Sequence, residues 1–220
     1  MHTYRVFFWD FDGTLYDTYA RMARAVMKGM DEMGLSHEGQ DVVALAKKTL
    51  RGACQVLGGD RSEELLSRFF AHEGDEGPES MRPYPGCEEA LRAVVDAGGL
   101  NFLYTHRNHT AVDALKQDGL YDLFRDFITW EAGFPDKPAP DALNWAIDLH
   151  RLERAECVMV GDRDIDALAG HAAGIASALY DPDGFYPDHT ADFRLRSLTD
   201  VAELLGGAAE PARAPTEGET

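Results

Sequence analysis

Residues 7–18 read FFWDFDGTLYDT, and the interpretation of the whole chain starts from this stretch. An apolar run ends at two carboxylates, Asp10 and Asp12, which stand one residue apart. Like charges this close repel each other, and an apolar setting strengthens the repulsion. The pattern is therefore expected to be a buried strand that leads into a charged site, where a cation would stabilise both carboxylates.

Further short apolar segments recur along the chain and predict a sheet. They are apolar throughout rather than alternating, which is typical of parallel strands covered by helices on both faces. Helical patterns separate them, as at Glu88–Ala97 and in the segment that Pro140 opens. The chain is thus predicted to be an α/β protein with a Rossmann-like, three-layer parallel core. The expected strands are Tyr4–Trp9, Leu100–Tyr104, Phe127–Thr129, Cys157–Val160 and Ile175–Leu179.

Residues 17–82 interrupt this alternation and are too long for one connecting loop. Their apolar residues step by three and four, which predicts helices. We expect a first helix from Tyr19, a second over Val43–Leu57, and a third that begins at a capping-box pair, Asp60 and Glu63. The predicted organisation is a core of residues 1–16 and 83–206, an all-helical insertion at 17–82 and a disordered tail at 207–220.

Composition limits the possible partners and the compartment. The formal net charge of −18 makes nucleic acid and anionic membranes unfavourable partners. Cys54, Cys87 and Cys157 form no CxxC pair and are interpreted as reduced thiols. The sequence has no pattern of a signal peptide or a membrane span, so we expect a cytoplasmic protein. A monomer and a homodimer are both compatible with the sequence.

The carboxyl ends of parallel strands meet at one edge of the sheet, where ligands bind in such folds. Several carboxylates at one point need a cation, and oxygen-only ligands favour Mg²⁺. A phosphate bound there could receive hydrogen bonds from a lysine and a hydroxyl, and Gly13 would allow close approach of backbone N–H groups. The residues that follow the predicted strand ends are Asp10, Asp12, Gly13, Thr105, His106, Arg107, Lys137, Asp162 and Asp166.

Four motifs follow one another in the expected order. They are DxDGT at 10–14, Thr105 at the end of the second strand, Lys137 in KPxP, and GDxxxD at 161–166. Together they resemble the haloacid dehalogenase-like hydrolase superfamily from residue 4 to the region of residue 205. The helical insertion looks like the family's C1 cap, and the LYTHR and GDRDID segments are similar to phosphoglycolate phosphatase-like sequences.

The resemblance implies roles for the acidic residues. Asp10 would be the nucleophile that forms an aspartyl-phosphate, and Asp12 would protonate the leaving alcohol and then activate water. Asp10, the backbone carbonyl of Asp12, and Asp162 would hold Mg²⁺, while Asp166 would orient the metal shell directly or through water. A proton donor must carry its proton at working pH, so we expect a raised pKa for Asp12 beside ionised Asp10.

The resemblance also implies a phosphate site. Thr105 and the N–H of His106 would bind the phosphoryl group, and Lys137 would bridge phosphate and nucleophile. His106 stands where Asn is frequent in the family, so its side chain is either free to vary or faces the substrate. Arg107 either contacts substrate or belongs to the loop before a helix near Thr110–Lys116.

These observations predict a Mg²⁺-dependent phosphatase for a small phosphomonoester. A sugar-phosphate mutase would use the same nucleophile and remains an alternative. Dehalogenases of the superfamily lack the second aspartate, so Asp12 argues against that activity, and no cap lysine is marked for phosphonate cleavage. A silent phosphate-binding module is the non-enzymatic alternative. The helical insertion is expected to close over the core about hinges at Tyr16–Thr18 and Arg82–Gly86.

Overall fold

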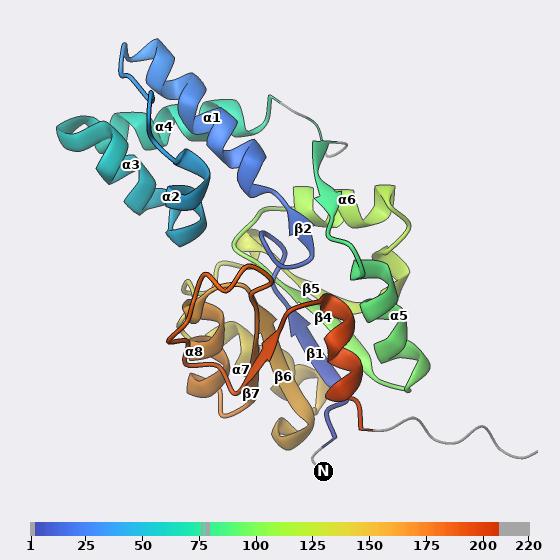
Figure 1. The fold of residues 1–220 in the computed structure, drawn as a ribbon. Helices are drawn as coiled ribbons and strands as arrows, with labels where there is room; N and C mark the ends of the chain where they lie inside the picture. The colour runs from blue at the N-terminus through green and yellow to red at the C-terminus, as the bar shows by residue number, and fades with distance from the viewer. Residues whose placement is uncertain (1–2, 76, 78–79, 207–220) are drawn as a thin grey trace, which may run out of the picture.

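The computed structural model describes residues 3–75, 77 and 80–206. Within these residues the chain forms a six-stranded sheet in the order β5-β4-β1-β6-β7-β8, and every neighbouring pair is parallel (Figure 1). The strands are β1 (Val6–Trp9), β4 (Leu100–Tyr104), β5 (Phe124–Ile128), β6 (Cys157–Gly161), β7 (Ala176–Tyr180) and β8 (Phe193–Leu195). The predicted α/β fold with a parallel sheet is confirmed.

The differences from the predicted strands lie at the edges of the sheet. Strand β5 begins at Phe124, earlier than the apolar run suggests, because Arg125 and Asp126 interrupt its pattern. Strand β8 was not predicted, since it has three residues and includes Arg194. Edge strands have one open side and tolerate such charges, so they leave a weak signal in the sequence.

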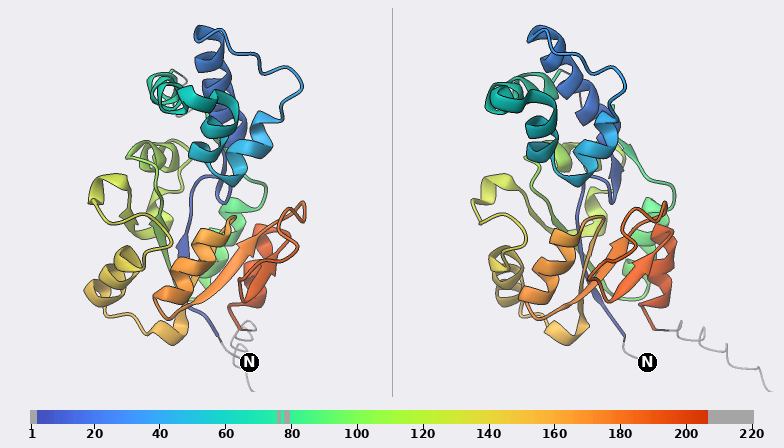
Figure 2. Two further views of the ribbon diagram at one scale, coloured as in Figure 1. Left: turned by 90° about the vertical axis from the view of Figure 1, so that its left-hand side faces the viewer. Right: turned by 60° about the vertical axis from the view of Figure 1, so that its left-hand side comes forward.

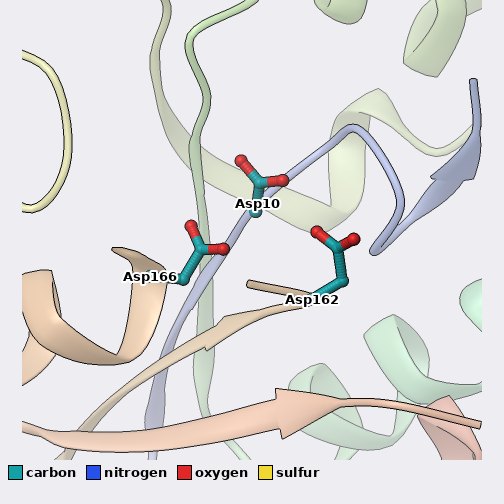
Figure 3. Close-up of side chains that lie close together, drawn as sticks. All are labelled: Asp10, Asp162 and Asp166. Carbon is teal, nitrogen blue, oxygen red and sulfur yellow. The ribbon is translucent and has the colours of Figure 1, made fainter. Parts of the chain in front are cut away.

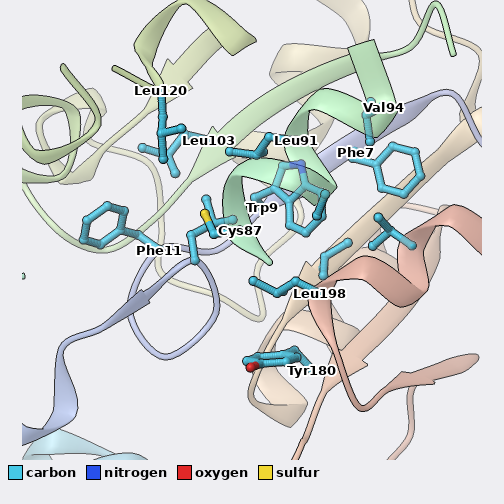
Figure 4. Packing of buried hydrophobic residues seen from close by; sticks show 14 of the residues in the cluster. Phe7, Trp9, Phe11, Cys87, Leu91, Val94, Leu103, Leu120, Tyr180 and Leu198 are labelled. Atoms are coloured by element: carbon cyan, nitrogen blue, oxygen red, sulfur yellow. The ribbon is translucent and has the colours of Figure 1, made fainter. Parts of the chain in front are cut away.

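Helices cover both faces of the sheet. On one face lie α5 (Cys87–Asp96), α6 (Thr110–Gln117) and the 3₁₀ helix η6 (Leu198–Glu203), which pack on residues such as Phe7, Trp9 and Leu103 (Figure 4). On the other face lie α7 (Asp141–His150) and α8 (Asp164–Ala172). Because both faces of the strands are covered, the strands are apolar throughout. Shorter 3₁₀ turns are η3 (Tyr121–Leu123), η4 (Trp130–Ala132) and η5 (Arg154–Glu156).

Strand β1 lies between β4 and β6, and this position brings the site residues together. Trp9 is in register with Leu103 of β4 and with Val160 of β6. Asp10, Thr105 and Asp162 directly follow these three strands, so they emerge side by side at the carboxyl edge. Chain order reverses across β1, and such a switch point is where parallel sheets bind ligands.

Four helices lie beyond this edge of the sheet in all three views (Figures 1 and 2). We call them the cap: α1 (Tyr19–Glu32), α2 (Val42–Lys48), α3 (Leu50–Gly58) and α4 (Ser62–Glu73). They enclose their own apolar cluster, which includes Val26, Met30, Leu65 and Phe69. The prediction of an inserted helical unit agrees with this arrangement, while the division at residues 17–82 stays a prediction. The predicted disordered tail lies outside the described residues.

Two chain crossings join the cap to the sheet. Strand β2 (Tyr16–Asp17) pairs antiparallel with β3 (Arg82–Pro83), so the two crossings are hydrogen-bonded to each other. This two-residue ribbon was not predicted, because it is too short to leave an alternating pattern. It coincides with the segments expected to act as hinges.

Two details of the predicted cap are wrong. The expected single helix over Val43–Leu57 is two helices, because Thr49 is extended and its hydroxyl accepts a hydrogen bond from the Gly52 N–H at 2.8 Å. The expected capping box does not form, since Asp60 lies in the 3₁₀ turn η1 (Gly59–Arg61) and Glu63 pairs with Arg51. Of the helices that the structure describes, none combines the length and apolar character needed to cross a membrane.

Candidate active site

Three buried carboxylates meet at the carboxyl edge of the sheet. Asp10 follows β1, Asp162 follows β6, and Asp166 lies in the first turn of α8 (Figure 3). One oxygen from each lies within 4.8 Å of the others, and the three residues are 1–2% exposed. Such proximity is unfavourable for three negative charges without cations.

Lys137 supplies one of these cations. Its Nζ donates hydrogen bonds to Asp10 Oδ1 at 2.6 Å, Asp166 Oδ1 at 2.7 Å and the Tyr104 carbonyl at 2.9 Å. The side chain is fully buried, and the two carboxylates outweigh the effect of burial, so the pKa of Lys137 is raised. The ammonium therefore stays charged, and all three of its protons are used.

The remaining oxygens fit a second cation. Asp10 Oδ2 and Asp162 Oδ1 are buried and have no hydrogen-bond partner among the described residues. Asp166 differs, because Oδ1 accepts from Lys137 and Oδ2 accepts from the Arg163 N–H at 3.2 Å. Buried, unpaired carboxylate oxygens suit a hard divalent ion such as Mg²⁺. Asp10 and Asp162 are thus fitted to hold a metal, and Asp166 to orient its neighbours.

The raised pKa values of Asp10 and Asp162 indicate that this cluster is short of positive charge. Burial raises the pKa of Asp10 to about 6, against the opposing effect of Lys137. Burial also raises the pKa of Asp162 to about 8, and the nearby charge of Asp10 adds to this effect. A bound divalent ion would favour the ionised forms, because metal ligands bind as carboxylates.

The cap contributes a residue that the sequence analysis did not identify. The Tyr19 hydroxyl, at the start of α1, donates a hydrogen bond to Asp162 Oδ2 at 2.7 Å. Burial raises the pKa of Tyr19 well above its ordinary value, so the hydroxyl keeps its proton. The sequence placed Tyr19 in the apolar stripe of a cap helix, and nothing in its spacing distinguishes it from a core aromatic residue.

Gly13 has a steric function at this point. Its φ is +79°, and an added Cβ would lie 2.3 Å from Tyr19 Cε2 and 2.4 Å from Asp162 Oδ2. The N–H of Gly13 donates to the Tyr16 carbonyl at 2.8 Å. The N–H of Gly13 is therefore already paired, and the absence of a side chain lets Tyr19 of the cap approach Asp162, while the expected part of Gly13 in phosphate binding stays a prediction.

The loop after β4 places Thr105 and His106 beside the acidic cluster. Thr105 Oγ1 accepts a hydrogen bond from the Arg107 N–H at 3.0 Å, which leaves its proton free to be donated. His106 Nε2 accepts from the Lys137 N–H at 2.9 Å. Burial and then the charge of Lys137 lower the pKa of His106 to about 4, so the ring is neutral and can accept this bond. The side chain of His106 thus holds the Lys137 loop.

The carboxylate of Asp12 is paired with Arg107, and this pairing changes the pKa expected for Asp12. Arg107 donates from Nε to Asp12 Oδ1 at 2.8 Å and also pairs through Nη2 at 2.7 Å. Burial alone would raise the pKa of Asp12, but the charge and hydrogen bond of Arg107 outweigh it and lower the pKa. The expected raised pKa is therefore wrong for this arrangement. The Arg107 side chain binds Asp12 and Glu73 of the cap, rather than pointing at the three-carboxylate cluster.

The raised pKa of Asp162 predicts a pH-dependent stability in metal-free protein. Above its ordinary value of 3.8 the unfolded chain loses this proton, while the folded chain keeps it up to about 8. The unfolded state then binds fewer protons, so the free energy of unfolding falls as pH rises through this window. In EDTA, the melting temperature of Asp162→Asn should fall less than that of wild type between about pH 6 and about pH 8.

Added Mg²⁺ should act in the opposite sense. It should raise the wild-type melting temperature more at about pH 8 than at about pH 6, because its ligands are then more easily ionised. The Asp162→Asn variant should lose most of this gain. If the melting temperatures of wild type and Asp162→Asn changed by the same amount with pH and with added Mg²⁺, the assignment of the proton to Asp162 would be contradicted.

The fold and the site define an α/β protein with a buried acidic cluster that could hold a metal ion. Comparison with known proteins then gives the family. Residues 7–180 match the haloacid dehalogenase-like hydrolase family, so the chain belongs to this family. A phosphoglycolate phosphatase of Aliivibrio fischeri is 33% identical over 184 residues, which are 76% of this chain and 80% of that protein. The pyrophosphatase PpaX of Halalkalibacterium halodurans is 25% identical over 203 residues, covering 90% and 94% of the two chains.

A solved structure supports the fold over nearly the full length. A haloacid dehalogenase-like hydrolase from Streptococcus pneumoniae superposes with a TM-score of 0.78 at 18% identity, covering 92% of this chain and 99% of that chain. The predicted membership in the superfamily and the prediction of an enzyme are confirmed.

Proposed function

We propose that this hydrolase is a Mg²⁺-dependent phosphatase that cleaves a small phosphomonoester through an aspartyl-phosphate on Asp10. The observation that carries the proposal is the state of Asp10 itself. One of its oxygens is bound by Lys137, while the other is buried and without a partner among the described residues, beside Asp162. Relatives that are named as phosphatases and as a pyrophosphatase support phosphoryl chemistry at this site.

The reaction would proceed in two displacements at phosphorus. In the first, an oxygen of Asp10 attacks, the bond from phosphorus to the substrate oxygen breaks, and Asp12 gives its proton to that oxygen. In the second, Asp12 takes a proton from water, and the water oxygen attacks phosphorus. Inorganic phosphate leaves, and Asp10 is restored as a carboxylate.

Residues around Asp10 would bind the transferred group. Thr105 can donate its hydroxyl proton, because its oxygen already accepts from the Arg107 N–H. The N–H of His106 is a second proposed donor, and the buried ammonium of Lys137 lies where charge on the phosphoryl oxygens would develop. Preorganised donors in a buried site stabilise such charge more strongly than water does.

The metal would be held by Asp10, Asp162 and the backbone carbonyl of Asp12, with Asp166 orienting the shell. When bound, Mg²⁺ supplies a positive charge that stabilises the ionised nucleophile and the phosphoryl oxygens. Within the described part of the chain, Asp10 Oδ2 and Asp162 Oδ1 accept no hydrogen bond, although Arg163 Nε lies 4.0 Å from Asp162 Oδ1, and these oxygens support the assignment. The engaged oxygens of Asp166 support an orienting role rather than direct ligation.

Asp12 must be protonated in the first displacement and ionised in the second. Bound to Arg107, it is held in the ionised form that the second displacement requires. Donation in the first displacement requires that Arg107 loosens its hold on this carboxylate. Rearrangement at Arg107 is therefore part of the proposed cycle.

The cap would close over the site during the reaction. Tyr19 reaches Asp162, and Lys47 of α2 lies 5.3 Å from the centre of the Phe185 ring in the core. The cap therefore touches the core at Asp162 and at Phe185. Opening about the β2–β3 ribbon would admit substrate, and closing would exclude water from the acyl-phosphate.

Phosphate release from a generic aryl phosphate tests this proposal. We expect release with Mg²⁺ and its loss in EDTA, with recovery when Mg²⁺ is restored in excess. Release that is unaffected by chelation would contradict the metal requirement. The protein would also be incubated with phosphosugars. Formation of an isomeric phosphosugar without release of free phosphate would favour the mutase instead.

A further inference from the structure

The three carboxylates of the acidic cluster differ in what holds them. Asp10 and Asp166 are held from within the core, because Lys137 Nζ donates a hydrogen bond to each. Asp162 accepts one hydrogen bond from the described residues, and its donor is the Tyr19 hydroxyl of the cap at 2.7 Å. One of the two carboxylates that we assign to the metal is therefore held by the cap and not by the core.

The Tyr19 side chain is closely enclosed where it meets Asp162. Tyr19 is the first residue of α1 and is 5% exposed. Its ring occupies the space that Gly13 leaves, since a Cβ on Gly13 would lie 2.3 Å from Tyr19 Cε2 and 2.7 Å from the Tyr19 hydroxyl. A buried hydroxyl that donates to a carboxylate makes a short, strong and directional bond. This bond therefore fixes the orientation of the Asp162 carboxylate.

The bond divides the two oxygens of Asp162 between the cap and the site. Tyr19 occupies Oδ2, while Oδ1 accepts no hydrogen bond from the described residues. Groups that hydrogen-bond a metal ligand orient it, and their loss typically weakens metal binding by about 10–100-fold. Tyr19 has the position of such a group.

The contact also depends on where the cap lies. Tyr16, in the ribbon that leads to α1, is tied to the core, because its hydroxyl donates to Asp118 Oδ2 at 2.8 Å and its ring stacks on Phe11. Tyr19 follows three residues later, inside the first cap helix (Figure 1). A hydrogen bond is lost once donor and acceptor are more than about 3.5 Å apart. A small rotation of α1 would therefore separate Tyr19 from Asp162.

Resting on the Mg²⁺ site proposed above, we propose that Tyr19 is a positioning residue that couples metal affinity to closure of the cap. With the cap closed, its hydroxyl orients Asp162 for the ion. With the cap open, Asp162 lacks this partner, and the ion is held more weakly. Such coupling is reciprocal, so bound Mg²⁺ also favours the closed cap.

Calorimetric titration of the metal-free, full-length protein with Mg²⁺ tests the effect on affinity. Tyr19→Phe keeps the ring and removes the hydroxyl, so the dissociation constant should rise about tenfold or more. Tyr16→Phe is the matched control, because it removes another tyrosine hydroxyl from an aspartate, Asp118, that is outside the acidic cluster. The control should leave the dissociation constant unchanged.

Distances between spin labels test the effect on the cap. Labels would be attached to Val56→Cys in α3 and Leu149→Cys in α7, which are 65% and 55% exposed, while the native cysteines are buried. Saturating Mg²⁺ should shift the distribution of distances toward one closed population. The same labels in Tyr19→Phe, at equal Mg²⁺ saturation, should show a smaller shift.

The outcomes distinguish this inference from the proposed function. If wild type binds Mg²⁺ and releases phosphate, but Tyr19→Phe binds Mg²⁺ as tightly or no more weakly than Tyr16→Phe, the inference alone is overturned. A distribution of distances that does not respond to Mg²⁺ in wild type overturns it as well, and this measurement still decides if Tyr19→Phe does not fold. A wild type that binds no Mg²⁺ would defeat both the proposed metal site and the coupling.

Discussion

Replacing Asp10 with Asn should abolish phosphate release, lowering kcat by about 10⁴-fold or more. The amide has nearly the same shape but cannot attack phosphorus as an anion. It also removes one of the two carboxylate oxygens that we assign to the metal and that accept no hydrogen bond from the described residues. Steady-state phosphate release from an aryl phosphate at saturating Mg²⁺ measures the effect.

The fold of this variant should be preserved or stabilised. The pKa of Asp10 is raised to about 6, which shows that its charge is unfavourable in the buried cluster, and the neutral Asn side chain removes that charge. Its melting temperature in EDTA should therefore be at least that of wild type. Glu88→Gln, on the exposed surface of α5, is the control for loss of a carboxylate. Retained turnover in a pure, folded Asp10→Asn protein would disprove the nucleophile assignment.

Replacing Lys137 with Met should reduce both stability and activity. Lys137 is fully buried and holds Asp10 and Asp166 together. Removing one partner of a buried ion pair costs about 3–5 kcal/mol of the free energy of unfolding. Activity should fall by about 10²–10³-fold, because the ammonium also faces the developing charge. Urea denaturation and phosphate release measure the two effects.

Added Mg²⁺ provides the internal check on this variant. A divalent ion should restore part of the lost stability, since it supplies positive charge to the same carboxylates. Lys116→Met, at an exposed position on α6 with 55% exposure, is the matched control and should change the free energy of unfolding by less than about 0.5 kcal/mol. An unfolding free energy of Lys137→Met equal to that of the control would contradict the role of the ammonium.

Much of the core could be predicted because central parallel strands have a strong pattern. Strands β1, β4 and β6 are buried on both faces, and each is followed by a polar residue at the edge of the sheet. Apolar runs and the polar residues after them therefore located the site. The short ribbon, the edge strand β8 and the helix break at Thr49 depend on hydrogen bonds that leave little trace in composition.

The site could be predicted only in part, for a related physical reason. Positions at strand ends are set by topology, which the sequence pattern indicates. The partners of long side chains depend on where the cap lies, and spacing does not indicate that. Three contacts depend on such placement and could not be predicted. They are Tyr19 with Asp162, His106 with the Lys137 loop, and Arg107 with Asp12 and the cap. The pKa of Asp12 was expected to be raised, and this was wrong because the sequence did not indicate that Arg107 pairs with Asp12.

The covalent intermediate on Asp10 is the central claim, and borohydride trapping tests it most directly. Protein quenched in acid during turnover with Mg²⁺ and substrate would be reduced, digested and analysed by peptide mass spectrometry. An aspartyl-phosphate is reduced to homoserine, whereas free carboxylates are unchanged. We predict homoserine at position 10, and its absence when substrate is omitted. Homoserine at another aspartate, or none in protein that is releasing phosphate, would contradict the account.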